Sequence, residues 1–377
     1  MKLFTNFSKF SISEIISIVI LGSFWIILAT QLSADEYGEI QFFLGVAAIS
    51  SGISIFGSGS SLTILLAKKL QIQSSIIIIS FIAGTFSAIT IFLIFNKLEI
   101  SLLIFGVITY NLGIYILQGK QEYNKYLYYN IFQKIIFISL AEISIFLNFE
   151  QIILALSISQ FIYFPTIIKN IKLNEINLIL IKRKINFLSH NYGLTIISII
   201  KENMDKMLIF PILGSSILGN YSLALQAILI LTGFITIINR YTLPLIAKGE
   251  NVTYFFKFSY ITIIPLFLVA FFIFPILIEN ILSQYVQSID AIRILSLSIP
   301  FYIIGVTYQT RFIALEKMTY VTFGNMIFIT SISLGMIVLG TNFGIIGISI
   351  TYVFSVAIQS IFYFSLRKKL DIIDNMK

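Results

Sequence analysis

The chain has 377 residues, of which 58% are hydrophobic and 11% charged, and its mean hydropathy is +0.96. Soluble domains carry about 25% charged residues, so this composition excludes an ordinary soluble domain and indicates a polytopic membrane protein. There is no cysteine and only one histidine, His190, so disulfides, thiolate sites and histidine-based metal sites are excluded. We therefore expect no metal and no other cofactor.

Apolar stretches of mostly about 18 to 27 residues follow one another along the chain, and each is long enough to cross a bilayer. The first stretch is longer than a signal-peptide core and has no small-residue cleavage site, so we expect it to be retained. We predict twelve spans, over residues 11–30, 38–66, 74–95, 99–118, 130–148, 150–169, 187–213, 217–247, 254–280, 289–311, 319–340 and 344–366.

The charges in the loops orient these spans. Twenty of the 25 Lys and Arg residues lie on the side of both termini, and Lys134, near the start of the fifth span, is counted among them. The opposite loops contain Lys97 and are otherwise acidic. By the positive-inside rule both termini are cytoplasmic. The net charge of +8 then reflects topology, and we expect no nucleic-acid partner.

The longest loop is polar and basic and lies near the middle of the chain. We predict a cytoplasmic linker at 171–186 between an N-terminal lobe, residues 1–170, and a C-terminal lobe, residues 187–377, with six spans each. Both lobes then have the same orientation, which makes the repeat parallel. Residues 32–38 and 213–219, which lead into the second and eighth spans, are counterparts in this repeat.

Four motifs spread over nearly the whole chain resemble those of one transporter superfamily. Residues 32–40, Leu-Ser-Ala-Asp-Glu-Tyr-Gly-Glu-Ile, resemble a "lG..eYG.y" turn. Residues 205–224 resemble "DklliG.flG...lG.YslA", residues 243–248 resemble "l.P.la+", and residues 344–349 resemble the start of a last helix. Together they resemble the Wzx-type O-antigen and polysaccharide flippases of the multidrug/oligosaccharidyl-lipid/polysaccharide (MOP) exporter superfamily. This chain departs from the pattern in its minimal loops and in the aromatic displaced after Gly38.

The resemblance implies an all-α integral membrane fold of 12 transmembrane helices in two six-helix bundles, which is MATE-like, V-shaped and built on a parallel pseudo-repeat. It implies translocation of a polyprenyl-(pyro)phosphate-linked oligosaccharide from the inner to the outer leaflet, by alternating access through a central charged cavity. We expect a monomer without enzymatic activity, surrounded by membrane lipids in the plasma membrane of a prokaryote. No nucleotide-binding motif surrounds Gly119-Lys120, so we do not expect this chain to be driven by ATP. The buried carboxylates are candidates for coupling to a proton or sodium gradient.

Residues 201–206, Lys-Glu-Asn-Met-Asp-Lys, place four charges and an amide inside the seventh predicted span. Ionisable groups at bilayer depth cost about 3 kcal/mol or more each unless they are paired or hydrated, so they are candidates for function. Lys201 with Asp205, and Glu202 with Lys206, are four residues apart and can neutralise one another. Alternatively they line a wet cavity, because they spread over about 200° of the helix surface.

Two further charges lie on helices that the resemblance places at the cavity. Arg240 has no acidic residue three or four positions away on its own helix, so it needs a partner on another helix or a substrate phosphate. Glu14 is either a solvated interfacial carboxylate or a cavity residue. The candidate binding residues are therefore Arg240, Lys206, Lys201, Asp205, Glu202, Asn203 and Glu14.

Two other functions remain open. A multidrug/cation antiporter of the same superfamily would favour acidic and aromatic cavity residues, whereas the candidates here include Lys201, Lys206 and Arg240. A membrane polysaccharide polymerase or glycosyltransferase would need a sizeable outer loop with catalytic Arg, Asp or His. The predicted outer loops are short and contain one basic residue, which disfavours that enzyme class.

Overall fold

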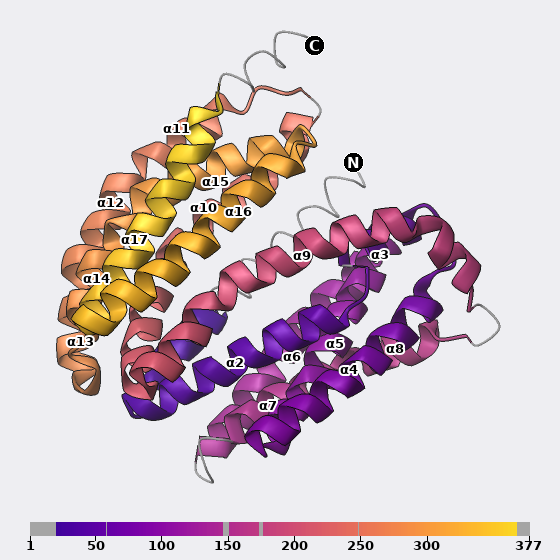
Figure 1. Ribbon diagram of the computed structural model, residues 1–377, viewed down its shortest axis with the longest axis horizontal. Helices are drawn as coiled ribbons and strands as arrows, with labels where there is room; N and C mark the ends of the chain where they lie inside the picture. The colour runs from indigo at the N-terminus through magenta and orange to yellow at the C-terminus, as the bar shows by residue number, and fades with distance from the viewer. Residues whose placement is uncertain (1–19, 58, 146–150, 173–175, 248, 368–377) are drawn as a thin grey trace. The chain divides into compact units, whose positions relative to one another are not determined.

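The computed structural model describes residues 20–57, 59–145, 151–172, 176–247 and 249–367, and within these ranges every regular element is a helix (Figure 1). The chain forms two compact units. Unit 1 takes in Phe43–Asn203, and unit 2 takes in Leu21–Phe42 and Met204–Lys377. Two long helices, α2 (Ala34–Ser54) and α9 (Leu178–Leu213), contribute to both units, so these units are not bounded as the predicted lobes are, and the lobe division stays a prediction.

The remaining helices belong to one unit each, apart from Ile20, the first residue of the helix Ile20–Ala29, which is assigned to unit 1. Unit 1 contains α3 (Gly59–Ala67), α4 (Gln73–Phe95), α5 (Leu98–Gly119), α6 (Tyr123–Ile145), α7 (Gln151–Gln160), η1 (Phe161–Tyr163) and α8 (Phe164–Asn170). Unit 2 contains an apolar helix over Ile20–Ala29, then α10 (Ser215–Ala247), α11 (Thr253–Ile261), α12 (Ile263–Leu268), η3 (Val269–Ile273), α13 (Phe274–Ile281), η4 (Ser283–Tyr285), α14 (Ser288–Ser296), α15 (Ser298–Ala314), α16 (Met318–Gly335), η5 (Met336–Gly340) and α17 (Thr341–Ser365).

The helices account for the predicted spans. Six helices of the described residues are long and apolar enough to cross a membrane, or eight if each of two bent pairs is one span. This number is below twelve partly because Met318–Ser365 is one continuous helix that carries two predicted spans. The two spans meet at a kink where Gly344 has a φ of 56°. Residues 11–19 of the first predicted span lie outside the described residues, and the rest of that span contains the apolar helix Ile20–Ala29. Each later predicted span falls largely on a helix or a broken helix, and the chain is a multi-pass membrane protein. Two helices begin earlier than predicted: α6 begins at Tyr123, and α9 begins at Leu178, so residues 178–186 of the predicted linker are helical.

Four helices end in the same way, and they do so at matching places in the two halves of the chain. At the ends of α3, α5, α10 and α15, the N–H of the third residue after the helix donates to the carbonyl five residues earlier, which is the Schellman arrangement. The second residue after each helix end takes a left-handed conformation; these residues are Lys69, Gln121, Gly249 and Glu316. Because these helices end the second, fourth, eighth and tenth predicted spans, the shared motif supports the parallel pseudo-repeat.

The turn before α2 is fixed by its own side chains. The backbone N–H and the hydroxyl of Ser33 each donate to a carboxylate oxygen of Glu36 at 2.8 Å, and the Glu36 N–H donates to the Ser33 hydroxyl at 3.3 Å. This reciprocal pair is a capping box, which satisfies the first free N–H groups of a helix. From η4, Gln284 donates to the carbonyl of Leu32 at 2.6 Å and to that of Ala29 at 2.7 Å. The turn is therefore held from both sides within unit 2.

In unit 2 the first turns of α2 and α10 approach each other at two glycines. A Cβ atom at Gly38 would overlap the carbonyl oxygen of Ser215, and one at Gly219 would overlap the carbonyl oxygen of Ala34. The contact is reciprocal, because each glycine meets the residue four positions before the other glycine. The Ser215 hydroxyl also donates to Asp35 at 2.7 Å. The two segments that meet here are the repeat counterparts 32–38 and 213–219.

Candidate functional site

The charged stretch of residues 201–206 lies on α9, at the point where the chain passes from unit 1 to unit 2. Lys201, Glu202 and Asn203 belong to unit 1, whereas Asp205 and Lys206 belong to unit 2. The stretch therefore contributes to two separate environments, which are described in turn below. Glu14 lies outside the described residues.

In unit 1, Lys201 is half-buried and interacts electrostatically with the exposed Glu202. Glu202 in turn interacts with Tyr115 on α5. Asn203 is buried, and its amide donates to the carbonyl of Ile199 at 2.9 Å on its own helix. Lys201 and Glu202 thus interact with each other, and Glu202 also interacts with Tyr115. The Asn203 side chain is hydrogen-bonded to the backbone of its own helix. Pairing of these charges four residues apart stays a prediction.

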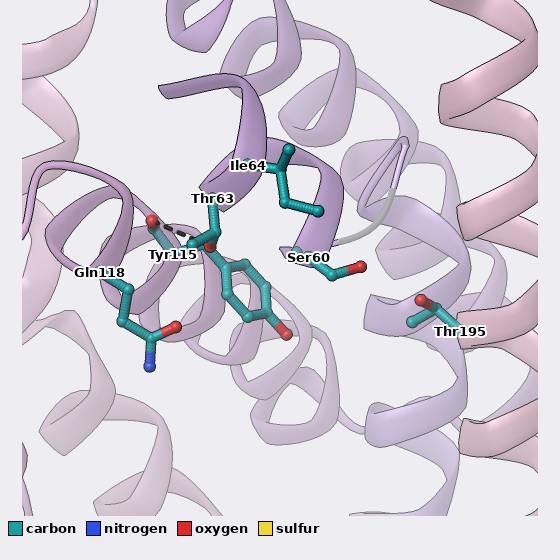
Figure 2. A pocket seen from close by; sticks show the side chains of 7 residues that line it. Ser60, Thr63, Ile64, Tyr115, Gln118 and Thr195 are labelled. Atoms are coloured by element: carbon teal, nitrogen blue, oxygen red, sulfur yellow. Dashed lines mark hydrogen bonds between the residues drawn. The ribbon is translucent and has the colours of Figure 1, made fainter. Parts of the chain in front are cut away.

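A pocket of about 430 Å³ opens beside Tyr115 (Figure 2). Its polar groups are the hydroxyls of serine, threonine and tyrosine and one amide, and they come from α3, α5 and α9. The lining residues are Gly59, Ser60, Thr63, Ile64, Tyr115, Gln118 and Thr195. The sequence predicted none of them as binding residues, because single hydroxyls in apolar helices are ordinary. The Gly-Ser-Gly-Ser-Ser stretch at 57–61 is the one signal that could have drawn attention to the pocket.

The break between α2 and α3 brings the Tyr115 ring into this pocket. The two helices meet at a bend of 44°, where Gly57 takes a φ of 81° that favours glycine. A Cβ atom at Gly59 would overlap the Tyr115 ring, so the ring packs directly on the α3 backbone. The Thr63 hydroxyl donates to the Tyr115 carbonyl at 3.3 Å (Figure 2). Tyr115 is therefore packed against α3 and lies within electrostatic range of Glu202.

Alanine at Gly59 is expected to displace the Tyr115 ring and to destabilise the protein by about 1–3 kcal/mol, the usual cost of overpacking. Thermal unfolding of the purified chain in detergent measures the effect. The second change Tyr115→Leu removes the ring edge, so the double variant is expected to recover much of the loss. An unchanged melting temperature for Gly59→Ala alone would contradict this packing.

In unit 2, Asp205 is buried, with 4% of its surface exposed. Its carboxylate accepts a hydrogen bond from the Lys206 backbone N–H at 2.8 Å and interacts electrostatically with the half-buried Lys206 side chain. Tyr221 on α10 and Tyr352 on α17 face the same carboxylate, and their rings lie edge to face with centroids 6.5 Å apart. Asp205 is thus a buried carboxylate lined by aromatic hydroxyls.

Polar groups continue from this carboxylate across unit 2. Tyr352 interacts with Tyr302 on α15, and the Tyr302 hydroxyl lies 3.1 Å from that of Thr236 on α10. In the ranges that the structure describes, no group of three or more His, Cys, Asp or Glu side chains could hold a metal ion. Arg240 is exposed on α10, and its role and that of Lys206 as phosphate ligands stay predictions.

The position of Lys134 corrects the sequence reasoning, which counted it among the cytoplasmic loop charges. The side chain is 4% exposed within α6, and its ammonium donates to Asn130 at 2.8 Å and to the Tyr110 hydroxyl at 3.1 Å. It also lies 5.0 Å from the centroid of the Tyr110 ring, in a cation–π contact. The neighbouring Gln133 donates to Ser159 at 2.8 Å. The three- and four-residue spacing of Asn130, Gln133 and Lys134 could have revealed this polar helix face.

No family model and no curated protein sequence matches the chain. Solved structures do match it. The lipid II flippase MurJ, in an inward closed conformation, superposes with a TM-score of 0.74 and 16% identity, covering 97% of this chain and 90% of MurJ. A multidrug resistance MATE family transporter of the MOP superfamily, in an inward-facing conformation, gives 0.70 and 13%, covering 96% of both chains. The chain has the fold of the MATE and MurJ transporters.

A third solved structure with this fold is a MOP superfamily transporter from Pyrococcus furiosus, for which reverse polarity of the binding pocket suggests a different function. Its TM-score is 0.69 at 14% identity, covering 97% of this chain and 95% of that chain. The predicted all-α, MATE-like fold class is confirmed by these matches. At identities of 13–16% these matches show the fold alone. The substrate has to be inferred from this chain's own residues.

Proposed function

We propose that this protein is a Wzx-type flippase of the MOP superfamily, which moves a polyprenyl-(pyro)phosphate-linked oligosaccharide from the inner to the outer leaflet by alternating access. The observation that carries the proposal is the presence of cations within α9 and α10 of a chain with this fold. Lys201, Lys206 and Arg240 lie in these helices. Ammonium and guanidinium groups bind phosphate through charge-assisted hydrogen bonds, which are about twice as strong as neutral ones.

The pocket beside Tyr115 supports a sugar-bearing substrate. Its volume of about 430 Å³ is typical of small-molecule sites. Thr63, Gln118 and Thr195 bring hydroxyl and amide groups that can donate to and accept from sugar hydroxyls. Because Tyr115 also interacts with Glu202, which interacts with Lys201, the sugar groups and one of the cations belong to a connected set.

The proposed driving force is a proton or sodium gradient, since the chain carries no nucleotide-binding motif. Asp205 is the residue for this role, because a buried carboxylate can take up a proton or pair with a cation. The proposal includes a monomer in a prokaryotic plasma membrane with both termini cytoplasmic. It includes no enzymatic step.

Replacing Arg240 or Lys206 by alanine is expected to slow translocation about tenfold each, because one charge-assisted contact to phosphate is lost. The measurement is a leaflet assay on proteoliposomes with a fluorescently labelled polyprenyl-linked glycan. Arg293→Ala is the matched control: this side chain is exposed on α14, lies 3.9 Å from Asp290, and should have no effect. Wild-type rates for both the Arg240 and the Lys206 variants would contradict the cation assignment.

A multidrug/cation antiporter is the second candidate, and the surroundings of Asp205 favour it. A buried carboxylate facing the aromatic side chains of Tyr221 and Tyr352 suits an organic cation. The same proteoliposomes distinguish the two functions. Efflux of an organic cation without movement of the labelled glycan would replace the flippase proposal by this one.

A further inference from the structure

A second pocket in unit 1, of about 610 Å³, lies where several helices end. It is formed by the C-terminal ends of α3 and α5, the segments leading into α4 and α6, and the residue two positions after α8. Three of its lining residues are lysines. The lining residues are Leu66, Ala67, Lys69, Leu70, Gln71, Gln73, Gly119, Lys120, Gln121, Glu122 and Lys172. Nothing in the proposed transport function uses this pocket.

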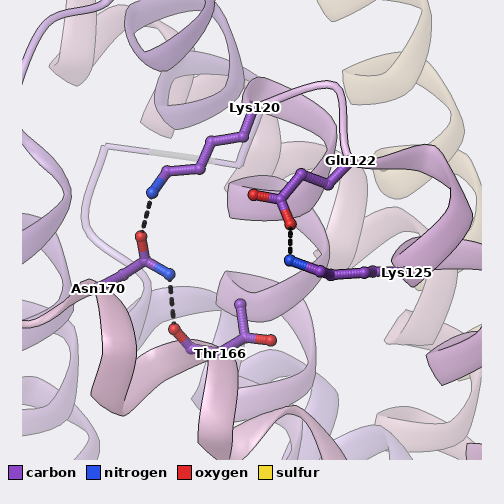
Figure 3. A network of polar contacts seen from close by, with 5 residues as sticks. All are labelled: Lys120, Glu122, Lys125, Thr166 and Asn170. Carbon is purple, nitrogen blue, oxygen red and sulfur yellow. Dashed lines mark hydrogen bonds and ion pairs between the residues drawn. The ribbon is translucent and has the colours of Figure 1, made fainter.

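The charge balance of the pocket is positive. Lys69, Lys120 and Lys172 contribute ammonium groups, whereas the one carboxylate among the lining residues is that of Glu122. Glu122 is held by Lys125, which is outside the lining set (Figure 3). The pocket also borders the start of α4, where Ile72 provides no side-chain cap. Helix N-termini favour anions, so the backbone adds to the field of the lysines.

Two of the three lysines are anchored to one framework, of which Figure 3 shows the part around Lys120 and Asn170. The Lys120 ammonium donates to the side-chain carbonyl of Asn170, whose amide donates to the Thr166 carbonyl at 2.7 Å. The Ser74 hydroxyl donates to the Asn170 carbonyl at 3.2 Å and accepts from the Lys172 N–H at 3.1 Å. The Lys120 head group and the Lys172 backbone are thus tied to the same few residues, so their positions are set before a ligand arrives.

The third lysine occupies a backbone position that favours glycine. Lys69 has a φ of 58°, and so does Gln121, which also lines the pocket. Gly249 is at the matching position after α10, where the same hydrogen bonds form. This kind of helix end therefore needs no side chain at that position. The Schellman hydrogen bonds already satisfy the last carbonyls of α3 and α5, so these side chains are not needed as caps. Retained strain of this kind points to a role for the side chain.

We propose that this pocket binds the phosphate group of an anionic ligand through Lys69, Lys120 and Lys172. Three ammonium groups on separate segments can surround a tetrahedral phosphate, and the amides of Gln71 and Gln121 can donate to its remaining oxygens. The topology predicted from the loop charges puts this pocket at the cytoplasmic ends of the helices. The phosphate can therefore belong to an inner-leaflet lipid headgroup or to a soluble phosphorylated compound.

The test is calorimetric titration of the full-length chain in detergent with dioctanoyl phosphatidylglycerol, with dioctanoyl phosphatidylcholine as the zwitterionic comparison. Wild type should bind the anionic lipid selectively. Each lysine changed to glutamine should weaken binding about fivefold, and all three together about 100-fold. The matched control changes Lys68 and Lys169, which are exposed neighbours outside the lining set, and should bind as wild type. Wild-type affinity in the triple variant, or an equal loss in the control, would overturn the proposal.

Two further measurements sharpen the result. Inorganic phosphate is added as a competitor: displacement of the lipid shows that the site also accepts soluble phosphate, and binding without displacement identifies the lipid headgroup as the source. The variant Lys69→Gly relieves the backbone strain while it removes the ammonium. It should therefore bind the lipid more weakly and melt at the same or a higher temperature than wild type. Unchanged binding by Lys69→Gly would remove Lys69 from the site and contradict the role of its strain.

Discussion

Alanine at Gly219 is expected to destabilise the folded protein by about 2–4 kcal/mol, at or beyond the upper end of the usual overpacking cost. The added Cβ would overlap the Ala34 carbonyl oxygen and lie 3.1 Å from the Gly38 nitrogen, and these are backbone atoms that cannot rotate away. The first turns of α2 and α10 would have to separate. Thermal unfolding in detergent, followed by circular dichroism, measures the loss.

The control is Gly193→Ala, a glycine within α9 whose Cβ would meet nothing within 4 Å. Because alanine is the better helix former by about 1 kcal/mol, this variant should melt at the same or a higher temperature. Gly38→Ala should resemble Gly219→Ala. The double variant should cost less than the sum, since one separation of the helices relieves both overlaps. A melting temperature for Gly219→Ala equal to that of Gly193→Ala would show that the crossing is not close.

Changing Asp205 to asparagine is expected to reduce gradient-driven transport about 100-fold. This factor is near the upper end of the roughly 5- to 150-fold effects that typical coupling free energies produce. Asparagine keeps an acceptor for the Lys206 N–H and nearly the same volume, so the fold should persist. What it loses is the charge facing Tyr221 and Tyr352. Transport into proteoliposomes, with and without an imposed proton or sodium gradient, measures the effect.

The control for this variant is Glu202→Gln, which neutralises an exposed carboxylate on the same helix. It should keep its response to the gradient. Asp205→Asn should translocate at the same low rate with and without a gradient, while its melting temperature stays near that of wild type. If Asp205→Asn were accelerated by the gradient as much as wild type, the coupling role would have to be assigned elsewhere.

The spans were predictable because each needs a long apolar stretch, which composition alone reveals. The turn at 32–38 was located from its resemblance to a family turn and from its repeat counterpart, whereas its capping box and its glycine crossing were not predicted, although a capping box leaves a short local pattern. The pocket beside Tyr115 was not, because it joins Ser60, Gln118 and Thr195 from distant parts of the chain. Such contacts follow from packing, on which local sequence patterns say little.

Lys134 and Lys69 show two other reasons for the limit of sequence reasoning. The side chain of a lysine near the start of a predicted span can extend to the membrane interface or point into the protein, and the sequence does not distinguish the two orientations. Lys134 turns inward because Asn130 and Tyr110 offer oxygens to its ammonium. Lys69 adopts a positive φ. In a sequence, glycine is the residue that indicates such a conformation, and a lysine at this position gives no sign of it.

The glycine crossing of α2 and α10 also bears on how the chain arose. Each of the two segments presents the same surface to the other, which is the rule for contacts between identical subunits related by a two-fold axis. In a symmetric dimer of a half-length chain, one glycine position would make this contact twice, once from each copy. In a single chain Gly38 and Gly219 can mutate separately, yet the loss of either one opens the same crossing.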